Sequence, residues 1–166
     1  MKVLVTYFSE TGNTEKLAKA IFEAVLSSKK EILPIQEATG IDDYDVIFIG
    51  FPVQSHNVPG SVEAFAKKLP EAKKVAYFAT HGSMRGGELA VTAFYHALHI
   101  AKNVVILGTF GCRGQVNQKI IDDLSTKIEH KAWAHEAQGA IGHPDEADFE
   151  DGRKWAQKMI VKARSS

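Results

Sequence analysis

Three hydroxyl side chains and a glycine gather in one short stretch, Ser9-Glu10-Thr11-Gly12-Asn13-Thr14. An apolar run of strand type precedes this stretch, and apolar residues at helical spacing begin directly after it. The first N–H groups of a helix have no partner within the helix, and together with the helix dipole they attract an anion. Hydroxyl groups at alternating positions can donate to further phosphate oxygens. The stretch is therefore either an anion site or a simple capped turn, in which a Ser or Thr satisfies the first helical amides.

The lysines and glycines of the sequence exclude two other phosphate-binding loops here. A triphosphate P-loop needs a Lys followed by Ser or Thr behind a GxxxxG spacing, and the stretch contains no lysine. A dinucleotide-binding turn needs the GxGxxG pattern, whereas Gly12 is the one glycine of the stretch. A single phosphate, held without an obligatory basic side chain, fits this loop best.

Five apolar segments of strand type alternate with segments of helical periodicity. The strand-type segments are 1–8, 31–35, 46–51, 75–79 and 104–110. Apolar residues at helical spacing lie between them, as Leu17, Ile21 and Val25 do after the first segment. Near-continuous apolar strands separated by helices predict an α/β fold: a doubly wound, five-stranded parallel sheet with helices on both faces.

Pro34 indicates the order of the strands in this sheet. A proline cannot donate to the hydrogen-bond ladder, so the second strand should lie at a sheet edge. This position favours the order 2-1-3-4-5 over 3-2-1-4-5, in which the second strand is internal. Ligands of such sheets bind at the carboxyl ends of the strands, where the strand order reverses. We therefore expect the loops after the first, third and fourth strands to form the site.

The last third of the chain is expected to contain two helices. Ile121 and Ile128 mark the first of them, and Asp145 is a candidate N-cap for the second, with Asp148 in its first turn. The stretch 130–144 between the helices has weak periodicity and is expected to be a loop. No long insertion is expected within or after the fifth strand.

Composition bounds the class of protein. The chain has 166 residues, 20 Lys and Arg against 20 Asp and Glu, and one cysteine. Zero net charge argues against a nucleic-acid-binding protein, and one cysteine excludes an internal disulfide framework. No apolar run approaches the roughly 18 residues of a membrane span. The sequence predicts a single domain over residues 1–166 in a cytoplasmic protein.

The pattern Ser9-x-Thr11-Gly12-x-Thr14 after a buried strand resembles the FMN-phosphate loop of the flavodoxin family. Residues 50–59 resemble the second flavin loop of that family, and residues 79–83 resemble the third. The resemblance extends from Lys2 to about Gly114, and the closing helix also fits. It implies a flavodoxin-like fold with FMN as the cofactor.

The resemblance also implies a division of labour among three loops. The first loop would bind the FMN phosphate through the hydroxyls of Ser9, Thr11 and Thr14 and through the amides of Glu10, Thr11, Gly12, Asn13 and Thr14. The second and third loops would clasp the isoalloxazine ring, largely by backbone groups of Pro52, Val53, Gln54, Ser55, His56, Asn57, Thr80, His81, Gly82 and Ser83. The flavin would supply the redox chemistry, and the protein would set its potential.

The sequence departs from this family in two respects. Many flavodoxins present a Trp or Tyr to the ring from the second and third loops, and here the candidates are His56 in the second loop and His81 or Met84 in the third. Asn57 is the residue of the second loop best suited to a positive φ. Typical flavodoxins are strongly acidic, whereas this chain is neutral, and Arg85 and Arg113 could join the two histidines at one rim. A cationic rim would favour a reduced, anionic flavin.

Two further residue types could carry chemistry. Cys112 is either a thiol whose thiolate is favoured by Arg113 or a small residue in a turn between glycines. His96 and His99 are three residues apart on one expected helix, but no third ligand is placed by the sequence, so no metal site is predicted.

The resemblance favours an electron carrier over an enzyme acting alone. Such a carrier would pass one or two electrons from a reductase or ferredoxin-like donor to an acceptor that the sequence does not identify. The alternative is an FMN-dependent NAD(P)H:quinone reductase or a flavodoxin-like protoporphyrinogen oxidase. A third possibility, an interaction module without FMN, is disfavoured by the intact first loop.

Overall fold

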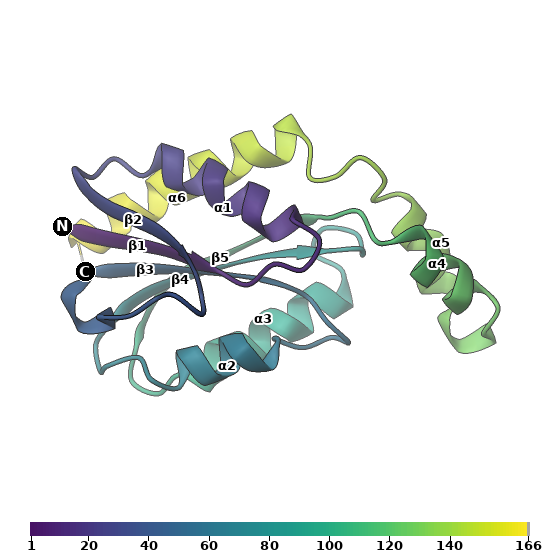
Figure 1. The fold of residues 1–166 in the computed structure, drawn as a ribbon, viewed down its shortest axis with the longest axis horizontal. Helices are drawn as coiled ribbons and strands as arrows, with labels where there is room; N and C mark the ends of the chain where they lie inside the picture. The colour runs from purple at the N-terminus through teal and green to yellow at the C-terminus, as the bar shows by residue number, and fades with distance from the viewer. Residues whose placement is uncertain (166) are drawn as a thin grey trace.

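The computed structural model describes residues 1–165, which form a parallel sheet with helices on both of its faces (Figure 1). The five strands are β1 (Lys2–Tyr7), β2 (Lys29–Pro34), β3 (Val46–Pro52), β4 (Lys74–His81) and β5 (Val105–Arg113). Their order in the sheet is β2-β1-β3-β4-β5, and every neighbouring pair is parallel. Both the predicted fold class and the predicted strand order are confirmed. Pro34 lies in an edge strand, where its missing N–H leaves no gap in the ladder.

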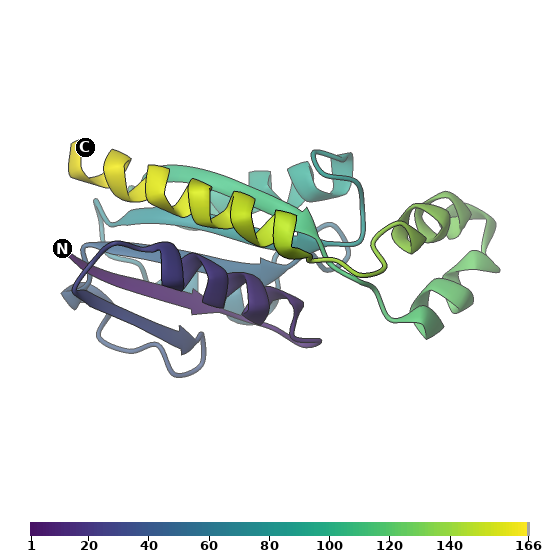
Figure 2. The same ribbon diagram turned by 90° about the horizontal axis from the view of Figure 1, so that it is seen from above.

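The helices form one layer on each face of the sheet. Helices α1 (Asn13–Ala24) and α6 (Glu146–Ser165) lie side by side on one face, and α2 (Gly60–Ala66) and α3 (Glu88–Ile100) cover the other (Figures 1 and 2). A 3-10 turn, η1 (Ile41–Asp43), precedes β3. None of the helices within residues 1–165 is long and apolar enough to cross a lipid bilayer.

The strands β1, β3 and β4 are apolar on both faces because both faces are covered. Alternate residues of each strand therefore belong to different cores. On β3, Ile47 and Ile49 point into the core beneath α2 and α3, whereas Val46 and Phe48 point into the core beneath α1 and α6. All four are fully buried. This burial explains the continuous apolar runs in the sequence and fixes the ends of the strands in space.

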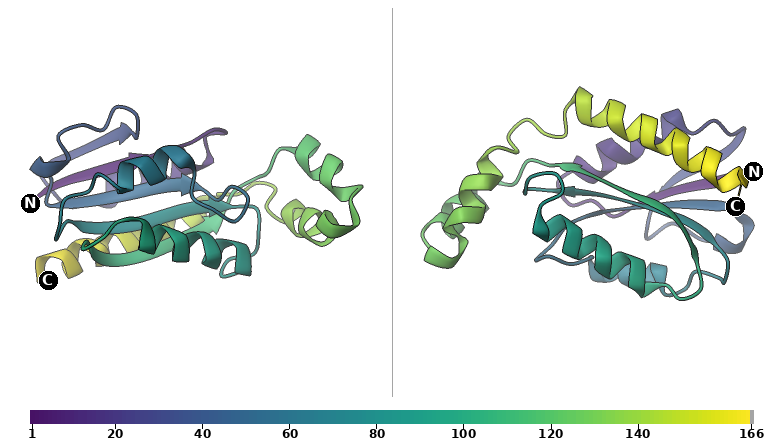
Figure 3. Two further views of the ribbon diagram at one scale, coloured as in Figure 1. Left: turned by 90° about the horizontal axis from the view of Figure 1, so that it is seen from below. Right: turned by 180° about the vertical axis from the view of Figure 1, so that it is seen from behind.

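A helical excursion, residues 114–145, follows β5 and stands beyond the carboxyl ends of the strands (Figures 2 and 3). It contains α4 (Gln118–Ser125), a 3-10 turn η2 (Ile128–His130) and α5 (Lys131–Gln138). Two expectations were therefore wrong: much of the stretch 130–144 is helical, and a long insertion does follow the fifth strand. Helix α5 has a weak hydrophobic pattern in the sequence because its buried positions are the alanines Ala134 and Ala137.

Two strands extend further than their apolar runs. Thr80 and His81 were predicted to lie in the loop after the fourth strand. Both instead belong to β4 and pair with Cys112 and Arg113. The same pairing brings Cys112 into β5 rather than into a turn. Polar residues at the ends of these strands are buried by their neighbours, which a pattern based on hydropathy does not reveal.

Candidate cofactor-binding site

The first loop joins β1 to α1 as a tight turn organised by Ser9. The Ser9 hydroxyl oxygen accepts hydrogen bonds from the amides of Gly12 at 3.2 Å and Glu15 at 3.3 Å. Gly12 has a φ of 88°, a left-handed conformation in which a side chain would be strained. The capped-turn interpretation is thus correct for Ser9, whose oxygen satisfies two amides at the start of the helix.

Ser9 does not satisfy the remaining amides of this loop. No acceptor within residues 1–165 receives a hydrogen bond from the backbone N–H of Glu10, Thr11, Asn13 or Thr14. Thr11 is exposed, and α1 begins at Asn13, so these donors lie where the helix dipole is positive. Unpaired amides at a helix N-terminus form a cradle for an anion. The geometry therefore fits a phosphate group, and it does so without a lysine or an arginine in the loop.

The second loop is a two-residue hairpin turn that closes beyond β3. Gln54 and Asn57 exchange both backbone hydrogen bonds, at 3.1 and 2.8 Å. The residues between them, Ser55 and His56, have φ values of 46° and 67°, as the two central residues of a type I′ turn do. The expectation that Asn57 would take the positive φ was wrong. Ser55, His56 and Asn57 are all exposed, which leaves this loop accessible at the carboxyl edge of the sheet.

The third loop begins behind a buried histidine. The His81 Nδ1 atom lies 2.9 Å from the carbonyl oxygen of Ser83, and because a carbonyl only accepts, Nδ1 is the protonated nitrogen. The Nε2 atom is buried without a partner in the described residues and lies on the side of Gly111 and Phe94. Burial lowers the pKa of His81, which favours the neutral imidazole. The ring points inward beneath α3. Stacking of His81 on the flavin ring stays a prediction.

The helical excursion packs on the third loop. A Cβ atom at Gly82 would lie 2.5 Å from Val116, 3.5 Å from Trp133 and 3.6 Å from Ala137, so a glycine is required for this close approach. The Glu136 carboxylate accepts a hydrogen bond from the amide of Met84. This contact cannot be predicted from the sequence, because only the fold brings residues 133–137 next to residues 82–84.

The two arginines expected at the rim both lie close enough to His81 to lower its pKa, and each has a partner of its own. Arg85 forms an ion pair with Asp151 of α6 at 2.7 Å, and its guanidinium lies over the ring of Phe110. Arg113 donates to the carbonyl oxygen of Glu136 at 2.7 Å and lies against Gly139. The charge of Arg85 is therefore paired with a carboxylate, and Arg113 binds α5 through a backbone carbonyl. The exposed His56 remains as a rim group of the second loop.

Cys112 is a residue of the core. It is fully buried in β5 among the side chains beneath α1 and α6, and burial raises the pKa of its thiol. A raised pKa disfavours the thiolate, which is the reactive form. Of the two interpretations, the structural one applies, although the residue lies in a strand and not in a turn.

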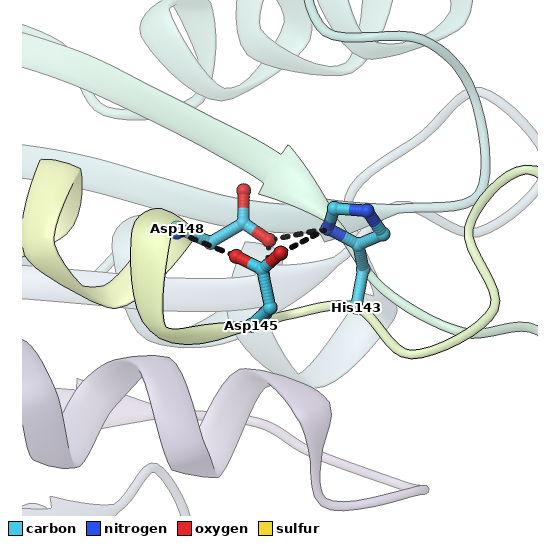
Figure 4. A group of neighbouring side chains, drawn as sticks. All are labelled: His143, Asp145 and Asp148. Carbon is cyan, nitrogen blue, oxygen red and sulfur yellow. Dashed lines mark hydrogen bonds and ion pairs between the residues drawn. The ribbon is translucent and has the colours of Figure 1, made fainter.

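His143, Asp145 and Asp148 lie together where α6 begins (Figure 4). The Asp145 carboxylate accepts from the amide of Asp148 and the Asp148 carboxylate accepts from the amide of Asp145, both at 3.0 Å. Nδ1 of His143 lies 2.5 Å from the same oxygen of Asp148. This reciprocal arrangement is a capping box, and it confirms Asp145 as the N-cap of the last helix. The cluster is explained by the needs of the helix end.

Comparisons with known proteins agree with this architecture. The family model described as "Flavodoxin domain" matches residues 4–157. The chain belongs to the flavodoxin family. The resemblance inferred from the first loop is thereby confirmed, and the match extends well beyond residue 114, across the helical excursion and into α6.

Two of three individual relatives cover nearly the whole chain. A flavodoxin-like domain-containing protein, BilS of Clostridioides difficile (strain CD3), is 31% identical over 178 residues, with 98% of each chain covered. The two-electron reduced flavodoxin of Megasphaera elsdenii has a TM-score of 0.58 at 23% identity and covers 99% of each chain. A flavoprotein of Lactobacillus acidophilus NCFM, solved in complex with FMN, has a TM-score of 0.55 at 19% identity, covering 75% of this chain and 98% of its own. The two solved structures support the fold.

Proposed function

We propose that this flavodoxin-family protein binds FMN and carries electrons between redox partner proteins. The observation that carries the proposal is the cradle of four unpaired amides, at Glu10, Thr11, Asn13 and Thr14, at the N-terminus of α1. Such a cradle suits one phosphate group, and FMN has one. The second and third loops lie at the same edge of the sheet, where backbone groups are available to an isoalloxazine ring. When bound, the flavin would supply the redox chemistry.

Three segments of the chain would hold the cofactor. The first loop would bind the phosphate by its amides and by the exposed hydroxyl of Thr11. The Gln54–Asn57 turn would lie along one side of the ring, and Gly82 and Ser83 along another. The electron donor would be a reductase or a ferredoxin-like protein, and the acceptor is still to be identified.

A cytoplasmic location stays a prediction, which cell fractionation tests.

The colour of the purified protein tests cofactor binding. We expect a yellow protein whose visible flavin absorbance is lost in the double variant Thr11→Ala, Thr14→Ala, because the phosphate loses a donor and the loop loses its buried hydroxyl contact. Thr92→Ala, which changes an exposed threonine of α3, is the matched control and should stay yellow. A colourless wild-type protein that does not take up added FMN would contradict the proposal.

The helical excursion favours a second candidate, an FMN-dependent NAD(P)H:quinone reductase or a flavodoxin-like protoporphyrinogen oxidase. It adds a wall of side chains beside the third loop, which a carrier does not require. Anaerobic addition of NADH or NADPH separates the carrier from the quinone reductase. A carrier keeps its flavin colour until a reductase is also added, whereas a reductase loses the colour with the nicotinamide alone.

A further inference from the structure

The last two residues of β4 join the segments that surround the proposed cofactor site. The Thr80 carbonyl oxygen accepts from the amide of Val53 at 2.9 Å, which holds the start of the second loop. The Thr80 hydroxyl oxygen lies 2.9 Å from that of Thr14, in the first turn of α1. The carbonyl oxygen of His81 accepts from the amide of Gly114, where the helical excursion begins. Thr80 thus bridges the first and second loops from within the sheet.

The hydrogen bond between Thr14 and Thr80 can run in either direction. Each hydroxyl has one proton to donate and can accept two hydrogen bonds. If Thr14 donates to Thr80, Thr14 has no proton left for an anion. If Thr80 donates to Thr14, the proton of Thr14 is free. No other acceptor in the described part of the chain takes the proton of Thr80, so nothing there opposes the second arrangement.

An anion bound at the start of α1 would favour one of these two arrangements. Thr14 carries one of the unpaired amides of the cradle, and its hydroxyl lies on the same first turn of α1. A negatively charged acceptor favours the arrangement that offers it one more proton, because hydrogen bonds to charged groups are stronger than those between neutral groups. Thr80 is 3% exposed, and a β-branched side chain packed at a strand end has few rotamers. Its hydroxyl is therefore held in place before any ligand arrives.

We propose that Thr80 is a positioning residue for the phosphate of the cofactor. Its hydroxyl donates to the Thr14 oxygen, and the Thr14 proton is then directed to the anion. Thr80 itself does not touch the phosphate. This inference rests on the proposed function, and it deepens it: Thr80 contributes to the preference for a phosphorylated flavin over riboflavin, which has no phosphate.

Binding of two flavins by the wild-type protein and three Thr80 variants tests this role. The apoprotein is titrated with FMN and with riboflavin, and flavin fluorescence gives each Kd. Thr80→Val keeps the shape of the side chain and removes the hydroxyl, so FMN binding should weaken about tenfold while riboflavin binding stays unchanged. Thr80→Ser retains the hydroxyl and should restore FMN binding to near the wild-type value. Thr80→Ala carries the same expectation as valine if the valine variant does not fold.

A double-mutant cycle tests whether Thr80 acts through Thr14. Thr14→Val should itself weaken FMN binding, and adding Thr80→Val to it should cause no further loss. Equal weakening of FMN and riboflavin in Thr80→Val would show a merely structural role and overturn the inference. Unchanged FMN binding in that variant would overturn it as well. A wild-type protein that binds neither flavin would instead overturn the proposed function, and the inference with it.

Discussion

The carboxyl end of the sheet is built from two regions with different support. The first loop and the end of β4 are held by buried contacts to strands that are covered on both faces, and the Thr14–Thr80 pair lies inside. The helical excursion has a small core of its own, centred on Ile121, Ala134 and Ala137, and Ile128 at its far turn is 92% exposed. The free energy of local opening follows the amount of buried apolar contact. We therefore expect the cradle to be the more rigid region and the excursion to open more readily.

Truncation in the core of the sheet should have the largest effect and should destabilise both regions. Phe48 is fully buried beneath α1 and α6, where its ring meets Trp155 edge-on. Phe48→Ala should lower the free energy of unfolding by about 3–5 kcal/mol, measured by urea denaturation. Hydrogen exchange should then accelerate in the strands and in the excursion together.

The exposed Ile128 offers a control for the Phe48 variant. Ile128→Ala removes a side chain with little burial, so the free energy of unfolding should change by less than about 0.5 kcal/mol. Unchanged hydrogen exchange in the strands of Phe48→Ala would contradict the view that the core of the sheet makes the cradle rigid.

A substitution at the contact between the regions should separate them. A Cβ atom at Gly82 would lie 2.5 Å from Val116, so Gly82→Ala forces the excursion away from the third loop. Such overpacking should lower the free energy for local opening of the excursion by about 1–3 kcal/mol. Hydrogen exchange should accelerate in α4 and α5 and stay unchanged in β1 and β3. Gly60→Ala is the matched control, because a Cβ atom there meets no atom within 4 Å.

His81 makes stability depend on pH at this same boundary. Burial lowers its pKa in the folded protein below the ordinary value near 6.5, so between these two values the unfolded chain binds more protons. Its contribution to stability is therefore present above pH 6.5 and is lost as the pH falls from 6.5 toward the folded pKa. Urea denaturation from pH 8 to pH 5 should show this decline, and His81→Asn should reduce it.

The exposed His99 of α3 provides the comparison for His81. His99→Gln should leave the decline of stability with pH as it is in the wild-type protein. An equal slope in the wild-type and His81→Asn proteins would assign the acid sensitivity to other groups.

The sequence predicts the rigid region well, and the physical reason is local. Pro34 indicates the strand order, and the residue types of Ser9 to Thr14 predict the turn and its donors from the local sequence alone. The excursion is different, because α5 owes its position to contacts with Gly82 and Met84, which are about fifty residues away in sequence. The Thr14–Thr80 contact spans 66 residues and is equally invisible in the sequence. Long-range contacts of this kind override local patterns.

The smallest expected change in the free energy of unfolding is at Tyr77 of β4, within the rigid region. Its hydroxyl is buried without a partner among the described residues, and burial raises the pKa of the phenol to about 12. A buried polar group that lacks a hydrogen bond is unfavourable, so Tyr77→Phe should raise the free energy of unfolding by up to about 1 kcal/mol. Tyr44 is buried as well, but its hydroxyl donates to Glu31 at 2.9 Å. Tyr44→Phe should therefore lower the free energy of unfolding by about 1 kcal/mol, and urea denaturation of the two variants should give opposite signs. If both variants were destabilised alike, a partner for the Tyr77 hydroxyl, such as a buried water, would have to exist in solution.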